Sequence, residues 1–403
     1  GYMRKETEYV SQGQQFINSV KGKFAELTRY ISVMDVVQKG IQFLKSGISS
    51  VVDINTAMTE LKKVTDETAG SYERFGKTAG DIATEVGTTR KEITNSTADF
   101  ARLGYSMEDS TKLAKSAAIY KNVGDGIDID TATENIISTL RGFQQEVDDV
   151  PKMIDIFNEV SNNTPIDAGG LGEALKRSAS AFNAANTDMN EAISLIVGAN
   201  SVVQNPEKVG NMWKTVSMRI RGAKVELEEA GEDTDDLVTS TSEMRDLVKG
   251  ITGFDIMKDK DTFKNMKDII VGIGKEWSNI SDIDRTALLN KLAGKTQANA
   301  LAAAFDNYKL IEETYQYTQN AEGSATEENA KYLDSIEGRI QVLNTSFQNL
   351  WANAVDDGFL KFWIDLGTNI LNVVDKIGMF KTAIGAVVGI ASFNGAGRAN
   401  FAI

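Results

Sequence analysis

Apolar residues recur at helical spacing over most of the chain, most clearly between Thr164 and Arg221. There, apolar positions three, four or seven residues apart define three amphipathic helices, each with one buried face. In the first helix the apolar residues are Leu171, Ala174, Leu175, Phe182 and Ala185. In the third helix they are Val209, Met212, Trp213, Val216 and Ile220. The connections are short, so we expect the three helices to be antiparallel neighbours.

Residues that favour helix ends separate these runs. Asp188 can accept hydrogen bonds from first-turn N–H groups of the second helix, and Glu191 completes the spacing of a capping box. Asn205 followed by Pro206 is typical of a helix start, because proline lacks an N–H that would be free there anyway. The same reasoning predicts helix starts at Ser106, Asp130, Pro151, Ser281 and Ser324. Predicted helix ends are Gly70, Gly76, Gly80, Gly104 and the pair Gly124 and Gly126.

Long amphipathic helices are predicted towards both ends of the chain. The apolar face of residues 37–63 consists of Ile41, Leu44, Ile48, Val51, Ile54, Met58 and Leu61. The helix predicted from Gly323 to Phe359 carries Leu333, Ile336, Ile340, Leu343, Phe347 and Leu350 on one face. The first face fits either a coiled-coil contact with another copy or packing within this chain. We favour internal packing, because the heptad pattern is short.

These patterns predict an all-α fold: a multi-helix bundle of short antiparallel helices, with long amphipathic helices at both ends. The three prolines all lie where a helix or turn is expected to start, which leaves long stretches free for helix. At most a short hairpin is expected, near Gly250 to Met257. We expect five segments: an N-terminal amphipathic segment (1–55), a helical core (56–226), an acidic excursion or linker (227–260), a second helical region (261–355) and an apolar C-terminal helical segment (356–403).

Composition excludes several kinds of chemistry. The chain has no cysteine and no histidine, so it has no disulfide, thiolate nucleophile, imidazole base or His/Cys metal site. The formal net charge of −14 repels phosphate backbones and disfavours binding of nucleic acid along the chain. The first residues lack the pattern of a secretory signal.

Three groups of residues resemble functional sites without meeting the requirements of one. Gly294, Lys295 and Thr296 spell the end of a phosphate-binding loop, but Leu289 stands where that loop needs glycine. A second group, Asp125, Asp128 and Asp130, lacks the spacing of a calcium loop. A third group, Glu232, Asp233, Asp235 and Asp236, is typical of a solvated surface. We therefore expect no catalytic residues, no cofactor and no metal, and a protein that is not an enzyme.

The apolar C-terminal segment is open to two interpretations. Residues 382–393 are free of charge, about a dozen against the roughly 20 that a membrane-spanning helix needs. Gly385 and Gly389 have a spacing that permits close helix approach. We favour a buried packing helix over a membrane-active segment.

The stretch GEALKRSASAFNAANTDMNEAISLIVGANSVVQNPEKVGNMWKTVSMRI resembles the core region of phage tail tape-measure proteins. DFARLGYSMEDSTKLAKSAAIY and DTATENIISTLRGF are similar to the same region, and Trp277 to Phe305 is similar to a second block of that family. The resemblance extends from about Asn55 to about Phe393.

The resemblance implies a structural virion protein that sets tail length during tube assembly and leaves ahead of the DNA at ejection. Implied partners are the tail tube protein, tail-tip or baseplate proteins, tail assembly chaperones and further copies of the chain, with contact to a host membrane through the C-terminal segment. The implied location is the tail lumen or tail tip, after assembly in the host cytoplasm. The alternative is a membrane-perforating, pore-forming helical protein.

Overall fold

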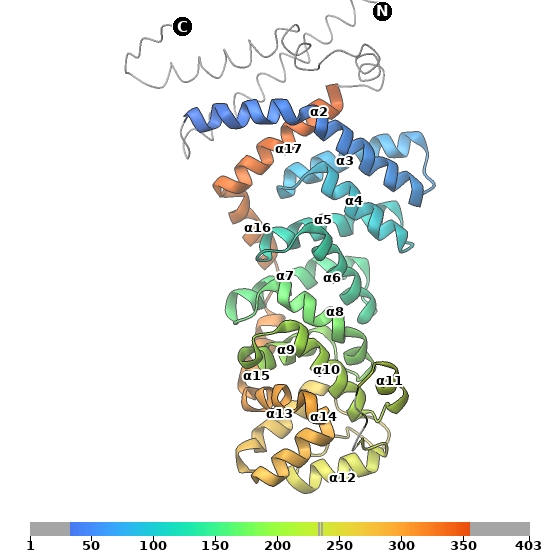
Figure 1. Ribbon diagram of the computed structural model, residues 1–403, viewed down its shortest axis with the longest axis vertical. Coiled ribbons are helices and arrows are strands. Elements are labelled where there is room, and N and C mark those ends of the chain that lie inside the picture. Colours follow the sequence, from blue (N-terminus) through green and yellow to red (C-terminus); the bar gives the residue numbers. More distant parts are fainter. Residues whose placement is uncertain (1–32, 233, 235–236, 355–403) are drawn as a thin grey trace, which may run out of the picture. The chain divides into compact units, whose positions relative to one another are not determined.

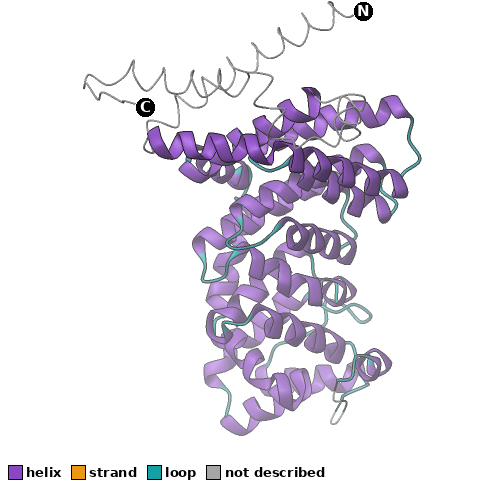
Figure 2. Ribbon diagram, turned by 45° about the horizontal axis from the view of Figure 1, so that its top comes forward, coloured by secondary structure: helices purple, strands orange, loops and turns teal. Residues whose placement is uncertain are grey.

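The fold is all-α, as the sequence predicts. The computed structural model describes residues 33–232, 234 and 237–354. Of these residues 79% lie in α-helices, and none lies in a strand (Figure 2). The antiparallel bundle arrangement stays a prediction.

Sixteen α-helices and two short 3-10 helices occur among the described residues, and Figure 1 labels most of them. The first helices in chain order are α2 (Val33–Val64), α3 (Ala69–Val86), α4 (Arg90–Arg102), α5 (Met107–Val123), α6 (Ile129–Gly142), η1 (Val147–Asp149), α7 (Val150–Asn163), α8 (Ala168–Ala184) and α9 (Met189–Val203). The remaining ones are α10 (Pro206–Ile220), α11 (Lys224–Glu229), α12 (Thr241–Thr252), α13 (Met266–Glu276), η2 (Trp277–Asn279), α14 (Asp282–Asp306), α15 (Tyr308–Gln319), α16 (Ser324–Asp334) and α17 (Ile336–Ala354).

The described residues form two compact units. One contains the residues up to Arg102 together with those from Lys331 onward, and the other runs from Leu103 to Ala330. The five segments expected from the sequence are divisions along the chain, and they stay predictions.

In the first unit, α17 packs against α2 and α3. Ile54 and Leu61 of α2 are buried there, as are Leu343 and Phe347 of α17. Polar contacts accompany this packing: the Asn349 side-chain amide donates to the carbonyl of Gly80 at 2.9 Å and to the hydroxyl of Thr84 at 3.1 Å. The Thr345 hydroxyl donates to the carbonyl of Thr88. The side chains of Ile41, Leu44, Ile48 and Leu350 lie outside the described residues.

The second unit is built from consecutive helix pairs: α5 with α6, α7 with α8, and α9 with α10. Helix α8 packs against both α6 and α10, so these three helices form one row. Helices α5 and α7 pack against each other in a second row. Helix α15 returns from later in the chain and packs against both α7 and α9 (Figure 1). The first helices of the pairs begin at Met107, Val150 and Met189, a spacing of roughly 40 residues that is typical of α-helical repeats.

The predicted core faces of the central helices are confirmed. Among the predicted residues, Leu171, Ala174, Leu175, Phe182, Val209, Met212, Trp213 and Val216 are fully buried. The Trp213 indole N–H donates to the carbonyl of Leu195 at 3.2 Å, and its ring lies 5.8 Å from the Phe182 ring, centroid to centroid. Trp213 therefore joins α10 to both α8 and α9.

Several predicted caps are confirmed, and one is wrong. Ser106, Asp188, Asn205 and Ser281 each accept a hydrogen bond from the backbone N–H three residues later. The cap of α6, however, is Asp128 and not Asp130: the Asp128 carboxylate accepts from the N–H of Thr131 at 2.7 Å. Asp130 lies in the first turn, where a negative charge favours the helix without capping it.

Helix α16 begins at Ser324, but its free N–H groups are capped from another helix. The Asp155 carboxylate of α7 accepts from the N–H groups of Gly323 at 2.9 Å and Ala325 at 3.0 Å. The Ser324 hydroxyl instead donates to Glu159 at 3.0 Å and accepts from the Asn158 amide at 2.9 Å.

The predicted helix ends at Gly70, Gly76 and Gly80 are wrong, because all three lie inside α3. Gly76 and Gly80 serve close packing: an added Cβ would lie 2.6 Å from the Arg90 guanidinium at Gly76 and 2.7 Å from the Asn349 amide oxygen at Gly80. Helix α3 ends at Gly87, whose φ of 75° is the left-handed conformation that glycine adopts readily. The predicted ends at Gly104, Gly124 and Gly126 agree with the ends of α4 and α5.

The single long helix predicted from Gly323 is interrupted at Ser335, between α16 and α17. The Ser335 hydroxyl accepts from the N–H of Gly338 at 3.1 Å, so it acts as a cap and starts a new helix. Near the predicted hairpin, residues 250–252 still belong to α12, and an isolated antiparallel bridge joins Met257 to Phe263.

Most of the N-terminal segment and all of the apolar C-terminal segment lie outside the described residues, and with them Gly385 and Gly389. Within the described part of the chain, no helix is both long enough and apolar enough to cross a membrane.

Replacing Trp213 with alanine is expected to lower the free energy of unfolding by about 3–5 kcal/mol, because it empties a fully buried aromatic site. It also leaves the Leu195 carbonyl without its indole donor. Chemical denaturation followed by circular dichroism measures the change. An unfolding free energy equal to that of the wild type would show that Trp213 does not hold α8, α9 and α10 together.

Candidate functional site

A close backbone approach in the second unit lies between α8 and α10. A Cβ added to Gly210 of α10 would lie 2.5 Å from the carbonyl oxygen of Ala174, so only glycine fits. At the exposed edge of this contact, Arg177 pairs with Glu173 on its own helix and with Glu207 of α10, both at 2.8 Å. The two helices therefore touch through backbone in the interior and through ion pairs at the surface.

A second close approach joins α5, α6 and α8. The Tyr120 hydroxyl donates to the carbonyl of Ala168 at 2.7 Å, and the Asn135 amide donates to that hydroxyl at 3.4 Å. A Cβ on Gly172 would lie 2.4 Å from both groups. Burial raises the pKa of Tyr120, so the hydroxyl stays neutral and acts as a structural hydrogen-bonding group.

Glu191 is the one buried carboxylate of the central helices. It completes the capping box at the start of α9 by accepting from the N–H of Asp188 at 3.0 Å. Only 8% of Glu191 is exposed, and this burial raises its pKa to about 7. The hydrogen bond from Asp188 and the charge of Lys267 oppose the rise, whereas the charges of Asp188 and Asp268 add to it.

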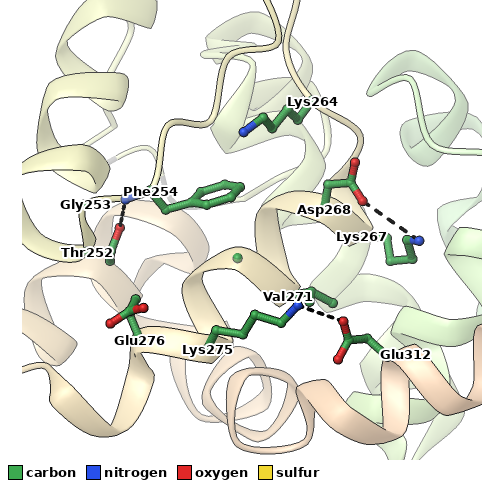
Figure 3. A pocket seen from close by; sticks show the side chains of 11 residues that line it. Thr252, Gly253, Phe254, Lys264, Lys267, Asp268, Val271, Lys275, Glu276 and Glu312 are labelled. Carbon is green, nitrogen blue, oxygen red and sulfur yellow. Dashed lines mark hydrogen bonds and ion pairs between the residues drawn. The ribbon is translucent and has the colours of Figure 1, made fainter.

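Beside α13 lies an open hollow with a volume of about 710 Å³ (Figure 3). Phe254 is one of its lining residues, and the Phe254 ring packs on Gly272: a Cβ added to that glycine would lie 2.2 Å from the nearest ring atom. The Lys264 ammonium lies 4.3 Å from the centre of that ring, and Lys275 pairs with Glu312 at 2.8 Å. The charged lining residues are Lys264, Lys267, Lys275, Asp268, Glu276 and Glu312. Because cations and anions balance, this hollow has no net charge with which to select an ion.

Where the structure describes them, residues of the three groups that resemble functional sites lie within a helix, at a helix cap or at a partly exposed position. Gly294 lies within α14 and follows no strand, so its surroundings are not those of a phosphate-binding loop. Asp128 is used as a helix cap, and the hydrogen bond from Thr131 lowers its pKa. Glu232 is partly exposed, while Asp233, Asp235 and Asp236 lie outside the described residues.

The described residues contain no group of three or more acidic side chains placed to hold a metal ion. What the arrangement provides instead is a set of helix pairs fixed in register by glycine contacts and buried hydrogen bonds. Sequence reasoning missed Gly172 and Gly210, because a helix interior gives no local sign that a neighbouring backbone needs the space. The roughly 40-residue recurrence of helix pairs was the signal that could have indicated stacking.

Comparison with known proteins identifies a family whose sequence model matches this chain. The sequence model of a family described as phage-related minor tail protein matches residues 76–294, which is more than half of the chain. The matched stretch contains all of α8, α9 and α10 and both close approaches. No solved structure matches the chain.

Replacing Gly210 with alanine is expected to lower the free energy of unfolding by about 1–3 kcal/mol, because the new Cβ meets backbone that cannot move aside. Gly250→Ala is the matched control: Gly250 lies in α12 with open space around it, so alanine there is expected to be neutral or stabilising. Denaturant titration compares the two variants. Equal stability of both would contradict the close contact at Gly210.

Glu191→Gln is expected to stabilise the protein increasingly as pH rises. A folded-state pKa of about 7, well above the ordinary value of a glutamate, means that the fold favours the protonated carboxyl. Its stabilising contribution is complete below the unfolded pKa and is lost as pH rises through about 7. Glutamine keeps the hydrogen bond and stays neutral. The stability difference, variant minus wild type, should therefore grow by on the order of 2 kcal/mol between pH 4.5 and pH 8.

Thermal and denaturant unfolding at the two pH values measures this difference, with far-UV circular dichroism to verify that both proteins are folded. A difference that does not change with pH would show that folding does not raise the pKa of Glu191.

Proposed function

Because the chain belongs to the phage-related minor tail protein family, we propose that it is the folded core of a tail tape-measure protein. Membership of this family gives the chain a structural role in the phage tail and makes it a component of the virion. Proteins of the family typically have no enzymatic role. The finer assignment, to the tape measure, is our proposal.

The observation that carries the proposal is the position of the family match. It includes Thr164 to Arg221, the stretch whose sequence resembles the tape-measure core, and the helices of that stretch form the packed centre of the second unit. The high helix content and the net charge of −14 agree with a protein that occupies a tube through which DNA later passes.

In the proposed mechanism, copies of the protein lie along the axis of the growing tail while the tube protein polymerises around them. Polymerisation stops when the far end is reached, and the copies leave ahead of the DNA at infection. The proposed partners are the tube protein, tail-tip or baseplate proteins, assembly chaperones and further copies of the chain. Contact with a host membrane through residues 356–403 belongs to the same proposal.

This core is not itself the extended ruler. The longest described helix, α2, has 32 residues and spans about 48 Å, and in the second unit successive helices pack side by side. We therefore assign length measurement to extended helical chain outside the folded core, and assembly contacts to the core.

Deletions test this division. In-frame deletions in extended helical chain outside the core should shorten tails by roughly 1.5 Å for each residue removed. Deleting Thr164 to Arg221 should instead abolish assembly or ejection, because it removes α8, α9 and α10 together. Electron microscopy of the tails measures their length. Viable particles whose tails shorten in proportion after the core deletion would show that the core is part of the ruler.

A separate experiment distinguishes the membrane-perforating alternative, which rests on the apolar run at residues 382–393. A tape-measure protein is expected to co-purify with assembled tail tubes or tips and to leave liposomes intact. Release of a trapped dye from liposomes by the purified protein, without its recovery in tails, would favour the alternative.

A further inference from the structure

Helix α14 contains a residue that is not helical. Helix α14 spans Asp282 to Asp306, but Gly294 within it has φ 69° and ψ 173°. This backbone conformation is essentially restricted to glycine. α14 therefore consists of two halves that meet at Gly294.

The bend at Gly294 is sharp, because residues near the two ends of α14 are close in space. Arg285, near the start of the first half, donates to the Trp277 carbonyl at 2.9 Å, and the Trp277 ring centroid lies 4.6 Å from that of Phe305, at the end of the second half. A continuous helix would place residues 283 and 306 about 35 Å apart, at 1.5 Å per residue. The second half thus folds back towards α13.

A buried arginine lies at the bend. Arg219, near the end of α10, is fully buried. Its Nε donates to the carbonyl of Lys291 at 3.1 Å and its Nη2 to the carbonyl of Asn290 at 3.3 Å. These carbonyls belong to the last turn before the bend, where a helix end has free acceptors and a partial negative charge. The guanidinium therefore caps the first half of α14 from another helix.

Gly294 is needed for its backbone conformation and not for space. A Cβ there would lie 3.4 Å from the nearest guanidinium atom, which is an ordinary contact. The residues around the bend, from Leu292 to Gln297, include no proline, so nothing covalent prevents a continuous helix. The bent form thus depends on the Arg219 contacts and on the packing around them.

We propose that Gly294 is a hinge that Arg219 holds bent, and that α14 opens to one continuous helix when the guanidinium leaves the carbonyls of Asn290 and Lys291. The hinge itself is a property of this chain and does not depend on the tape-measure assignment. Its use rests on the proposed function: an opened α14 is longer and thinner than the folded pair, which suits a protein that must leave through a tube.

Distance measurement between two spin labels tests the hinge. The chain has no cysteine, so Ile283→Cys and Asp306→Cys provide the only two labelling sites, and both native residues are exposed. Double electron–electron resonance spectroscopy on the labelled protein should give one distance well below 35 Å. Gly294→Ala should add a population near 35 Å, because alanine is strained at φ 69° and favours helix.

Arg219→Met should add the same population by removing the cap, and the double variant should contain more of it than either single variant. The expected change in the ratio of open to bent molecules is at least about fivefold for each substitution. Gly250→Ala and Arg221→Met are the matched controls: a helical glycine with open space and a neighbouring arginine that does not contact α14 carbonyls. Both should keep the short distance alone.

Two results would overturn the proposal: a wild-type distance already near 35 Å, or a folded Gly294→Ala variant that keeps only the short distance. If Arg219→Met fails to fold, as judged by far-UV circular dichroism, the Gly294→Ala result decides. Since this measurement uses the isolated protein, it is independent of tail length, and failure of the hinge is distinguishable from failure of the tape-measure assignment.

Discussion

The contact between Gly210 and the backbone of Ala174 fixes the geometry on which the rest of the second unit depends. It places the α10 backbone directly against the α8 backbone, and Trp213 fills the space beside this contact against α9. With α8 fixed, α6 packs on its other side and completes a row of helices. A protein that stacks helix pairs in this way needs no sheet, disulfide or metal to define its shape, because each pair sets the position of the next.

Polar groups supply specificity where the apolar faces alone would permit sliding. Asp155 caps a helix that starts more than 160 residues later, and the Met266 N–H donates to the Thr187 hydroxyl at 2.9 Å, which ties the start of α13 to the turn before α9. Such contacts have a single correct register, since a shift by one residue leaves a buried N–H without an acceptor. The bonded partners therefore select one arrangement among several that bury similar apolar area.

The sequence was sufficient where the signal is local. The faces of α8 and α10 followed from spacing alone, and the Asp188 and Asn205 caps followed from side chains that can reach their own helix. It was insufficient where the partner is distant. Gly80 could not be distinguished from a helix-ending glycine without knowing that Asn349 lies against it. Asp128 and Asp130 are both candidate caps by residue type, and only the backbone geometry shows that Asp128 accepts from the N–H of Thr131. Likewise, nothing near Arg219 in the chain indicates that it caps α14, because its acceptors lie more than 70 residues away.

The position of α15 against α7 and α9 sets the earliest time at which the second unit can finish folding during synthesis. Ile311 of α15 covers Gly198 of α9, with its Cγ1 only 2.3 Å from where a Cβ on that glycine would lie. On the ribosome, the 113 residues that follow Gly198 up to and including Ile311 take roughly 6–23 s to synthesise at about 5–20 residues per second. From the time Ile220 is made until Ile311 follows, the helices from α7 to α10 are complete in sequence, but one side of them faces water. The second unit can close only after its covering helix has emerged, so the nascent protein presents an apolar face during synthesis that the finished protein hides.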